Sequence, residues 1–182
     1  MTTQFATPSD VVGFWREAGP ARWFTKDAAF DEDFKARGLA LHETAAQGDL
    51  DPWSAHPEGA LALMILLDQL PRNAFRNTPR MFATDAKALE LAKAAVAAGH
   101  DAAVADDLRA FFYLPFEHAE DLDEQERAVA LMTPLGGESL AYAEIHRDVI
   151  RRFGRFPHRN AILGRKTTPD EQRFLDEGGF AG

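Results

Sequence analysis

Apolar side chains recur at three- and four-residue steps along most of this chain, the spacing that places them on one face of an α-helix. The pattern predicts helices over residues 9–17, 27–47, 58–70, 78–99, 104–113, 124–132, 138–153 and 168–177. The connections between these segments are short, which favours antiparallel packing of neighbouring helices. We therefore predict an all-α fold of about eight helices in antiparallel pairs.

Local residue chemistry determines the predicted helix ends. Residues typical of helix N-termini open three of the segments: Ser9, Thr78 and Thr168. Thr168 and Glu171 together have the spacing of a capping box, and Gly48 closes the second helix. We expect Pro71 to end its helix and Pro115 to interrupt another, because proline donates no backbone hydrogen bond and clashes with the preceding turn.

The segment Ala60–Leu67 is apolar on every side of its helix, which is typical of a helix packed on several faces. We expect this segment to form the centre of the core. The apolar run begins at Gly59 and stops at Asp68, far short of the ~20 residues needed to cross a bilayer. We therefore expect no membrane-spanning segment and no membrane partner.

Composition favours one helical domain. The chain has 182 residues, 46% of them hydrophobic, which is the usual size of a single domain with a substantial core, and we predict one domain over residues 1–182. Alanine and leucine number 50 against 10 for valine and isoleucine, which favours helices over strands. The absence of cysteine excludes disulfides and thiolate chemistry. The first eight residues lack the features of a secretory signal, so we expect a cytoplasmic protein.

Charge is distributed unevenly along the chain. The net charge of −9 argues against nucleic acid as a partner, because that binding depends on positive potential. Residues 151–166 nevertheless contain six arginine or lysine residues and no acidic residue, which leaves −15 for the rest of the chain. This basic segment either forms an anion pocket or pairs with the chain's own carboxylates. The acidic residues within 117–126 are the obvious internal partners.

Asp68 is the second unusual feature, because it follows the most apolar helix of the chain. A carboxylate at that position is disfavoured by the helix dipole and by desolvation, so it needs a partner. The candidates are Arg72, four residues on, and an arginine of the basic segment. Two interpretations stay open: a buried ion pair that locks two helices, or an acid held ready for a ligand or a proton transfer.

Three further polar residues could carry chemistry: Glu117, His118 and His146. His146 lies four residues after Tyr142 and four before Ile150, close to an apolar stripe, so we expect it to face inward. It is then either a core histidine or a ligand or base. Together with His158 these residues supply metal-ligating atoms, but no paired-histidine spacing occurs, and we predict neither a metal nor a cofactor.

Four longer motifs carry a resemblance to a known family. They cover residues 67–73 (LDQLPRN), 78–85 (TPRMFATD), 111–120 (FFYLPFEHAE) and 152–160 (RFGRFPHRN). With these motifs the chain resembles a bacterial family of uncharacterised proteins catalogued as a domain of unknown function (DUF924) along nearly its whole length. The resemblance implies a tetratricopeptide-like, right-handed array of paired helices without a textual repeat. It implies no reaction.

The resemblance also marks motif positions without giving any of them a role. In this sequence they are Asp68, Gln69, Arg72, Asn73, Tyr113, Glu117, His118, His146, Arg155, His158, Arg159, Asn160 and Arg165. These positions coincide with the three unusual features found from the residues alone. Leu70 departs from the family pattern, in which we expect phenylalanine, and this hydrophobic exchange does not affect the candidate site.

We therefore expect a binding module with a polar site for a small anionic ligand or an acidic peptide. The ligand-binding candidates are Arg72, Asn73, Tyr113, Arg155, His158, Arg159, Asn160 and Arg165. An alternative is a small-molecule enzyme in which a residue of the same pocket acts as acid or base, with the candidates Asp68, Glu117, His118 and His146. A second alternative is a tetratricopeptide-like interaction scaffold whose polar motifs are purely structural. The sequence does not indicate an oligomeric state.

Overall fold

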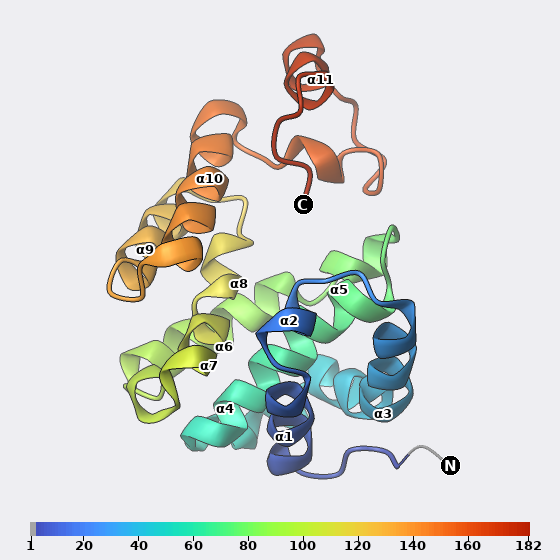
Figure 1. Cartoon of the computed structure of the whole chain (residues 1–182), viewed down its shortest axis with the longest axis vertical. Helices are drawn as coiled ribbons and strands as arrows, with labels where there is room; N and C mark the ends of the chain where they lie inside the picture. The colour runs from blue at the N-terminus through green and yellow to red at the C-terminus, as the bar shows by residue number, and fades with distance from the viewer. Residues whose placement is uncertain (1–2) are drawn as a thin grey trace. The chain divides into compact units, whose positions relative to one another are not determined.

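The structure is a computed structural model that describes residues 3–182 (Figure 1). Every regular element in these residues is helical, so the predicted all-α class is confirmed. The chain divides into two compact units. Unit 1 comprises the chain up to Arg76 together with Arg80–Pro115, and unit 2 comprises Asn77–Pro79 and Phe116–Gly182. The expectation of one domain over residues 1–182 stays a prediction.

Residues 3–182 contain eleven α-helical segments, more than the predicted eight, because residues 20–23, 70–74 and 114–117 also form short helices of their own. The segments are α1 (Pro8–Ala18), α2 (Pro20–Trp23), α3 (Ala28–Gln47), α4 (Pro57–Met64), α5 (Leu70–Ala74), α6 (Asp85–Ala97), α7 (Asp106–Arg109), α8 (Leu114–Glu117), α9 (Leu122–Met132), α10 (Gly137–Phe153) and α11 (Pro169–Asp176). None of the helices within residues 3–182 is long and apolar enough to cross a bilayer.

The core of unit 1 is built around α4 and the π-helical turn Ile65–Gln69 that follows it. All residues of the segment Ala60–Leu67 are at most 1% exposed, which confirms the predicted centre of the core. Helices α1 and α6 pack against α4, while α3 packs against the π-helical turn and α5. This burial on several sides explains why the segment lacks a polar face.

The expectation that Pro71 ends its helix is wrong, because the helical chain continues through the π-helical turn into α5. In this turn the backbone amide of Leu70 donates to the carbonyl of Ile65, five residues back rather than four. The wider turn accommodates the proline ring that a regular α-helix would exclude. As a result, Asp68 lies within a continuous helical segment and not at its end.

Two side chains from elsewhere in unit 1, His42 of α3 and Thr84 just before α6, contact carbonyls of this turn. The Thr84 hydroxyl donates to the carbonyl of Leu67 at 2.5 Å, and the buried ring of His42 contacts the carbonyl of Leu66 through Nδ1 at 2.9 Å. Burial lowers the pKa of His42, so the ring is neutral near pH 7. Since its neighbour is a carbonyl, Nδ1 carries the proton and donates.

Three other predicted helix starts need correction. Thr7, and not Ser9, caps α1, because its side chain accepts from the amide of Asp10 and forms a capping box. The helix expected from Thr78 begins instead with a 3-10 turn, and α6 starts only at Asp85. The helix expected over residues 104–113 is reduced to the short α7 followed by a 3-10 turn.

Unit 2 contains the α9–α10 pair, joined by the short turn 133–136, and the shorter α11 (Figure 1). Thr168 and Glu171 form the predicted capping box at the start of α11. The apolar centre of this part of unit 2 consists of Val149 and Ile150 of α10 and the fully buried Phe156. His146 is 8% exposed, which confirms that it faces inward.

We expect Thr84→Val to lower the free energy of unfolding by about 1 to 3 kcal/mol, because it leaves the buried carbonyl of Leu67 without its donor. Urea unfolding followed by circular dichroism measures the loss. Thr25→Val is the matched control: its hydroxyl also donates to a backbone carbonyl, that of Ala21, but at an exposed site. A loss in the control equal to that in Thr84→Val would contradict this account of the Pro71 turn.

Candidate functional site

Asp68 has two side-chain partners close to it in sequence. Its carboxylate is 1% exposed and lies 3.2 Å from Nη1 of Arg72, and Gln69 donates to it at 2.6 Å. Arg72 also donates to both carboxylate oxygens of Asp85 on α6, at 2.9 and 3.2 Å. Of the two candidate partners for Asp68, Arg72 is therefore a partner in the structure. Arg72 therefore links Asp68 of the π-helical turn to Asp85 of α6.

The other two candidate residues of unit 1 also contact carboxylates. Asn73 donates to Asp31 at 2.6 Å, and the hydroxyl of Tyr113 donates to Asp101 at 2.7 Å. Burial, together with the contact to Asp101, raises the pKa of Tyr113 above its usual value. The first contact joins residues 42 positions apart in the sequence, and the second joins residues 12 positions apart. Both therefore connect different helical segments of unit 1.

The basic segment makes several ion pairs inside unit 2. Arg165 contacts the carboxylate of Glu120 through two nitrogens, at 2.6 and 2.9 Å, and Arg151 contacts Glu126 at 2.5 Å. Both carboxylates lie in the acidic stretch 117–126, as the internal-pairing interpretation expects. Burial acts to raise the pKa of Glu120, but hydrogen bonds from Arg165 and from the amide of Phe156 lower it further than burial raises it.

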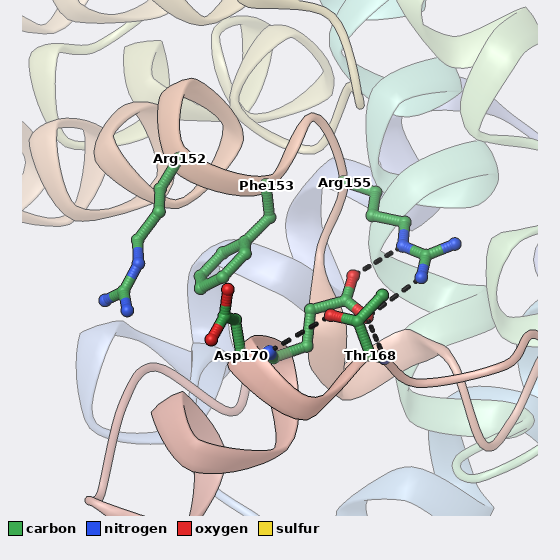
Figure 2. A pocket seen from close by; sticks show the side chains of 6 residues that line it. Arg152, Phe153, Arg155, Thr168 and Asp170 are labelled. Carbon is green, nitrogen blue, oxygen red and sulfur yellow. Dashed lines mark hydrogen bonds and ion pairs between the residues drawn. The ribbon is translucent and has the colours of Figure 1, made fainter.

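Arg155 pairs instead with Glu171 at the start of α11, at 2.6 and 2.9 Å (Figure 2). The hydrogen bond from Arg155 is the main cause that lowers the pKa of Glu171 to about 2. Asn160 also donates to Glu171, at 3.2 Å, and accepts from Arg165 at 2.9 Å. Sequence reasoning identified Glu171 only as a helix cap and missed this second role.

Figure 2 shows a pocket of about 460 Å³ next to this ion pair. It is lined by Arg152, Phe153, Arg155, Thr168, Asp170 and Glu171. The guanidinium of Arg152 lies over the ring of Phe153, 4.7 Å from its centroid. Because the lining contains both arginines and carboxylates, the pocket has no marked preference for a ligand of either charge.

A second group of candidate residues, here called the histidine cluster, lies elsewhere in unit 2. Its members are Glu117, His118, His146, His158 and Arg159. The rings of His118 and His146 are 6.2 Å apart. His146, His158 and Arg159 all lie against the ring of Phe156: the two imidazole centroids are 5.5 and 5.6 Å from its centroid, and the guanidinium is 4.5 Å from it.

The ring of His146 has a defined tautomer. Its Nδ1 lies 2.8 Å from the carbonyl oxygen of Tyr142 and 3.1 Å from a carboxylate oxygen of Glu117. Both neighbours are acceptors, so Nδ1 carries the proton and Nε2 keeps its lone pair. Burial is the main cause that lowers the pKa of His146 to about 3, so the ring is neutral at pH 7.

His158 lies on the 3-10 turn Pro157–Arg159 and differs from His146 in its contacts. Its Nδ1 is buried and has no hydrogen-bond partner within residues 3–182. Burial and the charge of Arg159 lower the pKa of His158 to about 4. Arg159 is 7% exposed and its guanidinium lies over the ring of Phe156, 4.5 Å from the centroid.

One aromatic residue that sequence reasoning missed contacts the histidine cluster. The ring centroid of Phe180 lies 4.3 Å from that of His146 and 5.4 Å from that of His158. The sequence signal that could have found it is weak: a Gly-Gly pair after the last helix, which allows the chain to reverse.

The structure therefore brings part of the candidate set together. Glu117, His118, His146, His158 and Arg159 form the histidine cluster, whereas Arg155, Asn160 and Arg165 form an ion-pair network in the same unit. Asp68, Arg72, Asn73 and Tyr113 belong to unit 1. No group of three or more metal-ligating side chains in residues 3–182 has the geometry to hold a metal ion.

These observations define an all-helical protein that carries a largely buried histidine cluster. A family model described as a bacterial protein of unknown function (DUF924) matches residues 11–179, so the chain belongs to that family, as its motifs predicted. The chain is 56% identical to a protein of unknown function from Agrobacterium tumefaciens whose structure has been solved. The likeness covers 94% of this chain and 97% of that one, with a TM-score of 0.93. No curated protein matches the chain at a significant level.

We expect Asp68→Ala to lower the free energy of unfolding by roughly 3 to 5 kcal/mol, because it removes one partner of a buried ion pair. The matched control is Asp33→Ala, which breaks a pair with Arg37 at the same four-residue spacing but with a side chain 38% exposed. The control should cost about 0 to 1 kcal/mol. Equal losses in urea unfolding would show that burial does not determine the effect.

We expect the stability difference between the wild type and Glu171→Gln to depend on pH. The folded pKa of Glu171, about 2, lies below its ordinary value of 4.5, so the ionised carboxylate stabilises the fold above about pH 4.5. This contribution is lost as the pH falls toward 2, and the two proteins should converge there. Urea unfolding between pH 7 and pH 2 measures the convergence. Asp170→Asn, whose side chain is 72% exposed, is the control and should differ little from the wild type at pH 7.

Proposed function

We propose that this protein binds a small anion, a carboxylate or a phosphate, at the histidine cluster of unit 2. In this proposal His118, His158 and Arg159 are the ligand-binding residues, and Glu117 orients His146 beside them. An acidic peptide would present the same carboxylate chemistry and is included in the proposal. The protein is then a binding module rather than an enzyme.

The observation that carries the proposal is the buried Nδ1 of His158. Buried polar atoms without a hydrogen-bond partner are uncommon in folded proteins, because each costs about 1 to 3 kcal/mol. An oxygen of a bound anion would accept a hydrogen bond from this nitrogen once it is protonated. In the complex, the bound anion then removes the free-energy cost of leaving Nδ1 without a hydrogen bond. This supports a binding role for the ring of His158.

The charges around His158 also favour an anion. After burial, the largest cause that lowers the pKa of His158 is the positive charge of Arg159, which outweighs the opposing charge of Glu120, so the potential at the ring is positive. The same potential stabilises a negative charge placed there. A bound anion would in turn raise the pKa of His158, so binding takes up a proton and tightens as the pH falls.

The remaining candidates have supporting roles in this proposal. Arg155, Asn160 and Arg165 hold the basic segment in place through Glu171 and Glu120. The four candidates of unit 1, Asp68, Arg72, Asn73 and Tyr113, stabilise that unit through their contacts with carboxylates and neighbouring side chains. A cytoplasmic location and the tetratricopeptide-like arrangement, with α9 and α10 as one helix pair, belong to the same proposal.

A second candidate function is acid–base catalysis on a small molecule. The observation that favours it is the contact between Glu117 and Nδ1 of His146, because a carboxylate that fixes the tautomer of a histidine leaves Nε2 as a base. The pKa of about 3 makes that base weak at pH 7. This low basicity supports binding over catalysis.

We expect inorganic phosphate or succinate to raise the melting temperature, with sodium chloride at equal ionic strength as the reference. At a hundredfold excess over Kd the ligand adds about 2.7 kcal/mol, which corresponds to roughly 5 to 10 °C for a chain of this size. The rise should be larger at pH 5.5 than at pH 7.5, because binding takes up a proton at His158.

His158→Gln should abolish most of this rise, and Arg152→Gln should retain it. Arg152 is the matched control because it belongs to the same unit but lies over the rings of Phe153 and Phe174 rather than in the histidine cluster. No rise with either anion at either pH, or an equal rise in His158→Gln, overturns the proposed site.

A further inference from the structure

The segment Gly178–Gly182, here called the strap, reverses direction after α11 (Figure 1). The amide of Gly178 donates to the carbonyl of Leu175, and the amide of Gly179 donates to the carbonyl of Phe174 at 2.9 Å. A Cβ atom on Gly179 would lie 2.5 Å from the ring of Phe174 and 2.6 Å from its carbonyl oxygen. Only glycine fits this path, which returns the chain toward the histidine cluster.

The strap places an aromatic ring against two histidines. The ring of Phe180 lies 4.3 Å from the ring of His146 and 5.4 Å from that of His158, between centroids. Further along the strap, Gly182 lies so close to His158 that a Cβ there would be 3.2 Å from Nε2. Two successive parts of the strap therefore lie against the imidazoles.

The strap is held mainly by ring packing. No hydrogen bond within residues 3–182 involves Phe180, Ala181 or Gly182, and Ala181 and Gly182 are exposed. Phe180 is half-buried against the apolar centre around Phe156. A segment with few hydrogen bonds and one anchoring side chain opens at low free-energy cost relative to the whole fold.

We propose that the strap is an autoinhibitory cover of the histidine cluster, which a small anion must displace in order to reach His146 and His158. This inference rests on the proposed function. The phenyl ring of Phe180 offers an anion no hydrogen bond and occupies the space beside the imidazoles, so ring and anion exclude each other. The strap thereby regulates access to the proposed site.

Displacing the strap would also change the charge of the cluster. Burial is the main cause that holds the pKa of His146 at about 3 and that of His158 at about 4. Water that enters when the ring leaves would raise both values toward 6.5. The charged groups that face the two rings stay in place: His118, Arg159 and Arg165 oppose the rise, whereas the carboxylates of Glu117 and Glu120 favour it. Opening therefore makes the histidines better anion ligands.

The test uses the full chain and two readouts: the histidine pKa values from an NMR titration, and the affinity for inorganic phosphate from calorimetry at pH 6. Phe180→Ala should raise the pKa of both His146 and His158 and lower the Kd for phosphate by about tenfold. Gly179→Ala should shift both readouts in the same direction, because its Cβ displaces the strap without removing the ring of Phe180.

Phe153→Ala is the matched control. It removes a ring of the same kind from the same unit, packed against Phe174 at 5.1 Å between centroids and not in ring contact with any histidine of residues 3–182. It should leave both readouts unchanged. If it raises the histidine pKa values as much as Phe180→Ala does, the effect is a general loosening of unit 2 and the cover is refuted.

The remaining outcomes separate the two proposals. If the wild type binds phosphate and Phe180→Ala changes neither the pKa values nor the Kd, the cover is refuted and the anion site stands. If the pKa values rise in Phe180→Ala but neither protein binds phosphate or succinate, the ring covers the histidines and the proposed function is refuted. If Phe180→Ala weakens binding, the ring contributes to the site and the autoinhibitory role is overturned.

Discussion

The need to give every buried polar group a partner shapes both units of this protein. In unit 1, Pro71 cannot donate a backbone hydrogen bond, and the carbonyls of Leu66 and Leu67 in the preceding turn contact His42 of α3 and Thr84 just before α6. The buried carboxylate of Asp68 has Arg72 and Gln69 beside it. A polar group left alone in such an interior would cost about 1 to 3 kcal/mol, so these contacts determine how the helices of unit 1 meet.

The same requirement explains the uneven charge of the chain. The basic segment 151–166 contacts carboxylates of its own unit, from Glu120 and Glu126 to Glu171. Its arginines therefore serve mainly to order the chain between α10 and α11. His158 differs from these arginines, because its Nδ1 is one of the buried side-chain atoms of residues 3–182 that have no hydrogen-bond partner. The functional proposal follows from this atom rather than from the number of arginines.

In the proposed site, access and charge are coupled through one aromatic ring. While Phe180 covers the imidazoles, burial keeps them neutral at pH 7. Once the ring leaves, hydration favours protonation, and a protonated imidazole donates to an anion. Movement of such a cover opens the site and changes the protonation of its histidines in one step. It needs no large rearrangement of the helices.

The sequence by itself determined the helical class, the buried centre Ala60–Leu67, the inward position of His146 and the capping box of Thr168 and Glu171, because these depend on local spacing and on hydrophobic pattern. Its motifs also indicated the family. Only the tertiary structure decided which partner each polar group has. Three examples are the contact of Arg155 with Glu171, the passage of the helix through Pro71, and the contact of the Phe180 ring with His146 and His158. Each depends on groups brought together from different parts of the chain. Sequence periodicity carries no information on such contacts, because it describes the face on which a residue lies and not what that face meets.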